Sequence, residues 1–341
     1  MTTTASTPVT PQLVTLPRSI YLEPTSRCNE FCQQCPRTLL SREDDRDLSF
    51  ENFRYIVDQF PVLERVVLHG LGEPLLNKEL PRMVRYLKDR GTYVLFNSNG
   101  IALTPKCGQA LIDAGLDEYR LSMDGSNRET YALIRGVDAF EKIWRNVKAF
   151  IELQKAQNAS KPAVSLWFTA MKENLHELPG LVELAAENGV PEIHLQRLVY
   201  FEEGMAQSKQ SLFRRSTHEE LELVRNCEQV CKERGIAFTA AGSATPLESL
   251  VHDFGERPWS GCHRPYSLTY ITSSGNVLSC CFAPFGHRSA REYKKERVLG
   301  NVFQESIEQI WHGERYQDFR HAFESDHPAR HCAQCGLNWS Y

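Results

Sequence analysis

The sequence predicts an α/β fold in which parallel strands alternate with helices, followed by a smaller block of a different kind. Between residues 18 and 235, short apolar runs alternate with stretches of helical periodicity, which is typical of β/α units that build an open sheet or a barrel. After residue 235 the pattern changes to a β-hairpin and a helix. With 41% hydrophobic and 24% charged residues in 341, the chain is expected to form a full core.

Each element of the first region has its own signal. Leu80, Val84 and Leu87 share one face of a helix that Gly91 ends, and Thr104 is the N-cap of the next helix. The predicted strands cover 20–22, 65–69, 93–96, 118–121, 163–169 and 192–198. The predicted helices cover 50–60, 80–90, 104–114, a long stretch that ends near 156, and 177–188.

The second block is predicted to hold a hairpin and one helix. Residues 266–271 and 276–279 flank Ser273-Ser274-Gly275, in which glycine takes the position of positive φ. A helix is predicted from 306 to 323 because its apolar residues fall on one face.

Charge and targeting signals exclude several classes of protein. The net charge is −4 and no basic block is present, so neither a nucleic-acid nor a membrane partner is expected. No run of eighteen apolar residues and no signal peptide is found, and residues 1–17 form a Thr/Pro-rich tail that is expected to be flexible. We therefore expect a cytoplasmic protein.

The first cysteines follow the first predicted strand. Cys28, Cys32 and Cys35 have the spacing C-x3-C-x2-C, and in a reducing compartment eleven cysteines favour metal ligation over disulfides. Three thiolates on a cubane iron–sulfur cluster leave one iron without a protein ligand, where a small molecule can bind. The spacing therefore indicates chemistry at an open iron.

Polar and glycine-rich segments follow the next three strands. They are Gly70-Leu71-Gly72-Glu73-Pro74, Asn97-Ser98-Asn99-Gly100 and Ser122-Met123-Asp124-Gly125. Each alone is typical of a turn. Because the carboxyl ends of parallel strands meet at one rim, where ligands bind in such folds, the segments together predict a binding site.

A second set of cysteines lies in the C-terminal block. A hairpin and a returning C-x2-C are able to gather four thiolates, either around a second cluster or around zinc, and the spacing leaves both open. The set is Cys262, Cys280, Cys332 and Cys335. Cys281 points to the other face of its strand and is not an expected ligand. The others, Cys107, Cys227 and Cys231, are expected to pack as small hydrophobes.

These residues resemble the radical S-adenosylmethionine (SAM) superfamily. Cys28-x3-Cys32-x2-Cys35 is similar to its signature, and Gly70-Leu71-Gly72-Glu73-Pro74 to the motif that holds the methionyl amino group of SAM. The resemblance implies a partial (β/α)6 TIM barrel over residues 18–235 and a SAM-binding [4Fe–4S] cluster on the three cysteines. It further implies SAM contacts from Gly70, Gly72, Glu73, Pro74, Asn99, Ser122, Asp124 and Arg135.

One position departs from the family pattern. The residue before the third cysteine is often an aromatic that leans on the adenine, whereas here it is Gln34. We therefore expect adenine packing from elsewhere, either Phe168 or Leu198.

Residues 236–341 resemble a linker and the twitch form of the SPASM extension. Cys262-x12-Gly275-x4-Cys280 is similar to the opening of that pattern, and Cys332-x2-Cys335 to its end. The resemblance implies one auxiliary [4Fe–4S] cluster on four cysteines, and it favours a cluster over zinc.

The resemblance implies an enzyme that uses a 5′-deoxyadenosyl radical to take hydrogen from a small polar substrate. The first hypothesis is two-electron dehydrogenation of a sugar or aminocyclitol alcohol in antibiotic or other secondary metabolism, with a flavodoxin or ferredoxin as electron donor. Candidate catalytic residues near the end of the sixth strand are Arg197, Glu202 and Glu203. The alternatives are decarboxylation or epimerisation of a nucleoside or sugar acid, modification of a ribosomal peptide, and plain electron carriage. The short stretch before the first strand argues against the leader-binding domain of peptide-modifying relatives.

Overall fold

The computed structural model describes residues 15–39, 45–212, 215–240, 245–251, 257, 259–286, 297–333 and 335. Residues 1–14 of the predicted tail lie outside this description. The described strands form one ten-stranded sheet in the order β10-β9-β8-β1-β2-β3-β4-β5-β6-β7. From β8 through β1 to β7 every neighbouring pair is parallel, which confirms the predicted α/β class.

All six predicted strands are present and follow one another across the sheet. They are β1 (Ser19–Leu22), β2 (Arg65–Val67), β3 (Tyr93–Ser98), β4 (Glu118–Ser122), β5 (Ala163–Ala170) and β6 (Glu192–Arg197). A further parallel strand, β7 (Ala237–Ala240), was not predicted, because four residues with a single large apolar side chain give little periodic signal.

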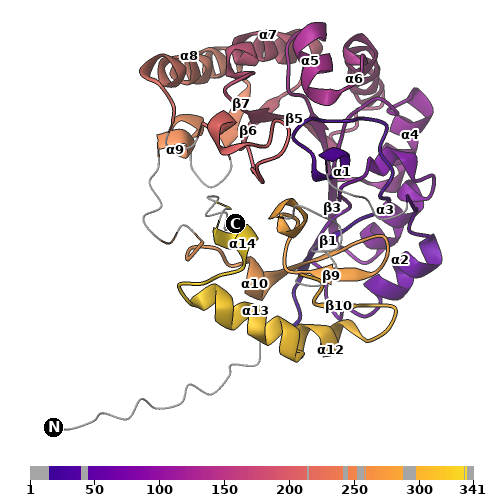
Figure 1. Ribbon diagram of the computed structural model, residues 1–341. Coiled ribbons are helices and arrows are strands. Elements are labelled where there is room, and N and C mark those ends of the chain that lie inside the picture. Colours follow the sequence, from indigo (N-terminus) through magenta and orange to yellow (C-terminus); the bar gives the residue numbers. More distant parts are fainter. Residues whose placement is uncertain are drawn as a thin grey trace, which may run out of the picture.

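Helices follow the strands and lie in an arc on the outer side of the sheet (Figure 1). The arc is built from α2 (Phe50–Val57), α3 (Leu80–Asp89), α4 (Pro105–Ala114), α5 (Arg128–Arg135), α6 (Phe140–Ala156), α7 (Leu178–Asn188) and α8 (His218–Arg234). Short helices α1 (Pro36–Leu39), α9 (Pro246–Val251) and the 3-10 turns η1 (Pro74–Leu76), η2 (Leu175–Glu177) and η3 (Ser208–Gln210) lie in connections. No helix within the described ranges is long and apolar enough to cross a membrane.

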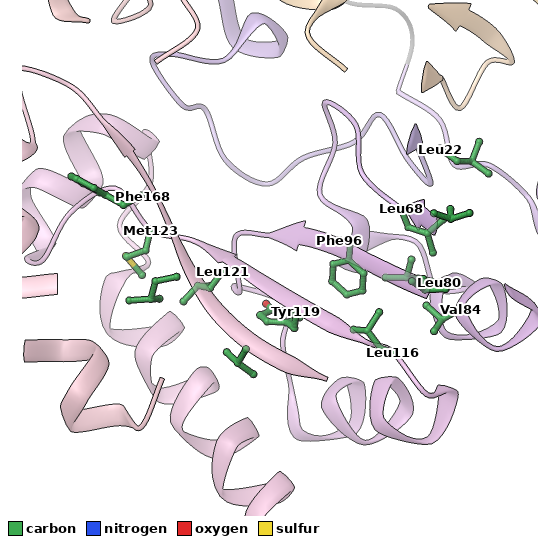
Figure 2. Packing of buried hydrophobic residues seen from close by; sticks show 14 of the residues in the cluster. Leu22, Leu68, Leu80, Val84, Phe96, Leu116, Tyr119, Leu121, Met123 and Phe168 are labelled. Atoms are coloured by element: carbon green, nitrogen blue, oxygen red, sulfur yellow. The ribbon is translucent and has the colours of Figure 1, made fainter. Parts of the chain in front are cut away.

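The main core lies between the strands and these outer helices. Side chains alternate along each strand, so Leu121 and Phe168 pack in this core (Figure 2). The next residues along these strands, Ser122 and Thr169, line the cleft described below. Phe168 is completely buried in this core and does not line the cleft described below, so it is not available to adenine, contrary to one of the two expectations.

The C-terminal block continues the same sheet. Strand β8 (Leu268–Ile271) pairs in parallel with β1, and β9 (Asn276–Leu278) and β10 (Gly300–Asn301) follow in antiparallel order. The predicted hairpin is therefore confirmed, although its first strand begins at Leu268, because α10 (Arg264–Ser267) precedes it. The helix predicted from 306 to 323 is broken at Gly313, where the backbone is extended. Its parts are α12 (Ile307–His312) and α13 (Glu314–Glu324), and η4 (Ala283–Gly286) and α14 (Arg330–Ala333) complete the block.

Candidate active site

The loop after β1 brings the first three cysteines together. The backbone N–H of Phe31 donates to Arg135 O at 3.1 Å and that of Gln33 to Ile134 O at 2.9 Å, which fastens the loop to α5. Burial raises the pKa of all three thiols, that of Cys28 to about 12, and the three act electrostatically on one another. Thiols that are gathered and buried in this way are suited to a metal cluster, which stabilises thiolates that the protein alone does not.

The segment after β2 packs directly against this loop. A Cβ on Gly72 would overlap the carbonyl oxygen of Thr25 and lie 2.7 Å from that of Arg27. A Cβ on Gly70 would collide with the side chain of Glu23. Glycine is therefore required at both positions for close packing rather than for a special backbone angle.

Glu73 is held as a buried acceptor beside this packing. Its Oε1 accepts from Leu75 N at 3.1 Å and from Ser98 Oγ at 2.7 Å, and its Oε2 accepts from Asn99 N at 2.7 Å. Burial raises the pKa of Glu73 to about 7. Since each carboxylate oxygen accepts two hydrogen bonds, Oε2 can take one more donor. The predicted contact with the amino group of SAM requires such an acceptor.

Arg135 lies between two buried carboxylates on the opposite side. Its Nη2 is 2.8 Å from Asp124 Oδ2 and its Nη1 is 3.3 Å from Glu30 Oε2. The hydroxyl of Tyr131 also donates to Glu30, and burial raises the pKa of both carboxyls. The Nε of Arg135 is buried with no partner among the described residues, so it is available to an acceptor such as the SAM carboxylate.

Gln34, the departure from the family pattern, is part of the same network. Its Nε2 donates to Asp124 Oδ2 at 2.8 Å, while Thr169 N donates to Asp124 Oδ1 at 2.8 Å. The carboxylate of Asp124 thus already accepts hydrogen bonds from protein donors, so it has little remaining capacity to accept one from the ribose hydroxyls of SAM. Leu198, the second residue expected to pack on adenine, does line the cleft.

These groups line one cleft with about 930 Å³ of atom-free space, part of it open to solvent. The cleft contains the three cysteines, Arg197 and all predicted SAM contacts except Pro74, which is buried at the start of η1: Gly70, Gly72, Glu73, Asn99, Ser122, Asp124 and Arg135. Glu202 and Glu203 do not line it and lie exposed in a turn, where Glu202 accepts from Ser208 N.

The sequence assigned no contact with SAM to several polar residues that also line the cleft, among them Glu30, Gln34, Thr169 and Gln196. Thr169 and Gln196 are the inward-facing residues near the ends of β5 and β6, so the alternation of side chains along these strands predicts that they face the cleft. Glu30 lies inside the cysteine loop, and no pattern distinguishes it from a solvated loop charge.

The second cysteine set is also gathered by the fold. Burial raises the pKa of the Cys332 thiol, and the next causes are the charges of the other three cysteines of the set, Cys280, Cys335 and Cys262. Arg264 Nη1 donates to the Sγ of Cys281 at 3.5 Å, and the exclusion of Cys281 from the ligands stays a prediction. Within the described ranges no three Cys, His, Asp or Glu side chains lie close enough to hold a single metal ion.

The remaining cysteines behave as predicted. Cys227 and Cys231 are buried in the core on α8, and the half-buried Cys107 packs against that core.

Fold and site together define a barrel-type α/β protein in which three cysteines line a polar cleft. The family model of the Radical SAM superfamily matches residues 22–195, and that of SPASM, an iron–sulfur cluster-binding domain, matches residues 262–336. The chain belongs to the radical SAM superfamily and is a radical SAM enzyme with a C-terminal SPASM domain. Its cofactors are SAM and two [4Fe–4S] clusters, one of them auxiliary.

Known relatives act on different molecules. The AdoMet-dependent heme synthase of Methanosarcina barkeri is 25% identical over 340 residues, which cover 94% of this chain and 88% of that protein. The PqqA peptide cyclase of Granulibacter bethesdensis is 23% identical over 327 residues, which cover 95% and 81%. The crystal structure of Streptococcus suis SuiB bound to S-adenosylmethionine has a TM-score of 0.65 at 16% identity, covers 89% of this chain and 68% of that one, and shows the fold alone.

Proposed function

We propose that this enzyme oxidises an alcohol of a small polar substrate, a sugar or aminocyclitol, by two electrons. The observation that carries the proposal is the pairing of β8 with β1. The loop after β1 holds the first cysteines, and Cys280 follows β9, the strand that pairs with β8, so the two cysteine sites are connected to strands of one sheet. An electron acceptor held on the same sheet as the radical site suits net oxidation.

The residues that we propose as ligands follow from this arrangement. Cys28, Cys32 and Cys35 would hold the SAM-binding cluster, and Cys262, Cys280, Cys332 and Cys335 the auxiliary one. When bound, SAM and its cluster supply the radical that takes hydrogen from carbon. Glu73 and Arg135 would hold the amino and carboxylate groups of SAM. The buried carboxylates Glu30, Glu73 and Asp124 complement the positive sulfonium of SAM.

The substrate side of the cleft offers polar groups at the end of β6. Gln196 and Arg197 line it, and Arg197 is a donor to substrate oxygen rather than a base, because even a pKa lowered to about 10 by burial keeps it charged. Dehydrogenation breaks one C–H and one O–H bond and forms C=O: the hydrogen atom goes to the radical and the remaining electron to the auxiliary cluster. The hydroxyl proton goes to a base, for which we propose His69.

His69 lines the cleft and is neutral at pH 7, since burial lowers its pKa to about 4. Its ring donates to the backbone of Asn97, and Nδ1 has no partner among the described residues, so Nδ1 is the acceptor. Electron loss makes the hydroxyl strongly acidic, so a weak base is sufficient.

The test uses anaerobically reconstituted enzyme with SAM, a flavodoxin or ferredoxin as electron donor, and a panel of sugar and aminocyclitol alcohols. We expect 5′-deoxyadenosine in one-to-one ratio with a product two mass units lighter than the substrate. A sugar or nucleoside acid that loses forty-four mass units, or that inverts without a mass change, would replace the proposal by decarboxylation or epimerisation.

A second candidate is peptide modification. It is favoured by the match to the PqqA peptide cyclase over nearly the whole chain. A precursor peptide that is cross-linked, with no reaction of any alcohol in the panel, would establish it in place of the first.

A further inference from the structure

The two cysteine sites differ in their electrostatic surroundings, because buried carboxylates lie at the first site. Around the first site, three buried carboxylates, Glu30, Glu73 and Asp124, face the cleft together with the buried Arg135. The Cys32 thiol donates to Glu30 Oε2 at 3.4 Å, and the charges of Glu73 and Glu30 act on Cys28. Arg135 pairs with two of these carboxylates, Arg197 lines the same cleft, and the charge of the buried Arg37 acts on Cys35, so buried groups of both signs surround the first site.

Around the second site two buried arginines lie near the cysteines. Arg264 follows Cys262 by two residues, is buried, and donates through Nη1 to Cys281 Sγ at 3.5 Å. Its charge acts on Cys262 as well, because both thiols lie near the guanidinium. Arg297, also buried, donates to Ala283 O at 2.9 Å, and its charge acts on Cys332.

Contacts of Tyr21 join the region of these two arginines to the cleft. Its side chain is hydrogen-bonded to the Cys281 thiol, and its ring lies edge-on to that of His69 with centroids 6.4 Å apart. Tyr21 also pairs with Tyr270 across β1 and β8. The wall of the cleft and the loop of the second cysteines are therefore in contact through one side chain.

We propose that Arg264 makes the auxiliary cluster the electron acceptor of this enzyme by raising its reduction potential above that of the SAM-binding cluster. The role as electron acceptor rests on the proposed function, whereas the reduction potentials are measured without substrate and do not depend on it. Reduction adds a negative charge to a cluster that already carries four thiolates. A nearby buried cation stabilises that charge, and buried carboxylates oppose it.

The experiment is a potentiometric titration of the reconstituted holoenzyme followed by electron paramagnetic resonance, without substrate. SAM changes the signal of the first cluster alone, and a Cys332→Ala variant retains that cluster alone, so the two signals can be assigned. In the wild type we expect the auxiliary cluster to be reduced at the higher potential. In Arg264→Met the equilibrium constant for reduction of the auxiliary cluster should fall about tenfold, which lowers its potential by about 59 mV for one electron. The potential of the first cluster should not change.

Two variants separate charge from packing. Arg264→Lys keeps the charge and should restore most of the potential. Arg320 is another buried arginine of the same block, and it donates hydrogen bonds to Pro265 O at 3.0 Å and to Trp311 O at 2.8 Å. Arg320→Met should leave both reduction potentials unchanged.

Several results would overturn the inference. They are an auxiliary potential at or below that of the first cluster in the wild type, an Arg264→Met variant with full iron and no shift, or an Arg320→Met variant with an equal shift. If Arg264→Met does not bind full iron, the inference is tested by the order of the two reduction potentials in the wild type and by the potential of the auxiliary cluster in Arg264→Lys. If no alcohol is oxidised but the auxiliary cluster still has the higher reduction potential, the proposed function fails and the inference about Arg264 stands.

Discussion

The two cysteine sites of this protein are built in different ways. The first takes its three cysteines from eight consecutive residues and opens onto a cleft lined by carboxylates. The second collects cysteines from between 262 and 335, out of a hairpin and a returning helix, among buried arginines. With the ligands that we propose, the first arrangement would leave one iron open for a small molecule, whereas the second would supply a cysteine to every iron. The difference teaches that one protein can give similar clusters different tasks through ligand number and nearby charge.

The largest effect is expected from the first site. Cys32→Ala should abolish formation of 5′-deoxyadenosine, because SAM cleavage requires the open iron, and should lower the iron content from roughly eight to roughly four atoms. Iron analysis and chromatography of the nucleoside check this. Cys107→Ala, a cysteine that packs against the core on α4, is the matched control and should change neither. Retained cleavage of SAM in Cys32→Ala would refute the assignment of this loop.

The second site should respond in the complementary way. Cys332→Ala is expected to lose roughly four irons yet still cleave SAM, since the first cluster does not depend on it. The ketone should disappear because the electron acceptor is gone. Unchanged iron, or one equivalent of zinc in the wild type, would show that no auxiliary cluster is present at these cysteines.

A smaller effect is expected from the packing between the two rim segments. Gly72→Ala places a methyl group on the Thr25 carbonyl, so the cysteine loop must shift. We expect a destabilisation of about 1–3 kcal/mol and a loss of SAM affinity on the order of 100-fold, about 2.7 kcal/mol. Gly91→Ala, where φ is +78° but the space is open, should cost about 1 kcal/mol and leave SAM binding intact. Thermal unfolding and equilibrium dialysis measure both, and equal SAM affinities in the two variants would contradict the model of close packing.

The smallest effect is a dependence of SAM binding on pH. The raised pKa of Glu73, about 7, means that this carboxyl is protonated in the empty cleft below pH 7. Because the amino group of SAM needs the ionised carboxylate as acceptor, affinity should rise with pH, by about tenfold from pH 6 to pH 8. Glu73→Gln should bind more weakly and lose this dependence, while the auxiliary cluster is unaffected. A wild-type affinity that is flat over this range would remove Glu73 from the SAM site.

Much of the architecture could be predicted from local patterns. Alternation of apolar runs with helical periodicity located β1 to β6, and the position of Glu73 after β2 indicated the rim. Strand β7 and the break at Gly313 were missed, because short elements and single backbone turns have almost no periodic signal. Glu202 and Glu203 were placed near the site by sequence distance from β6, but a turn directs them to solvent.

The sequence alone determined the chemistry of the first site, since three thiols and a glycine-rich segment at fixed spacing need only a strand and a turn to meet. Only the tertiary structure decided what surrounds each cluster. The pairing of β8 with β1, the capture of Asp124 by Gln34 and the approach of Arg264 to Cys281 join residues that are distant in the chain. Such contacts depend on how the whole sheet closes, and for that reason local spacing does not encode them.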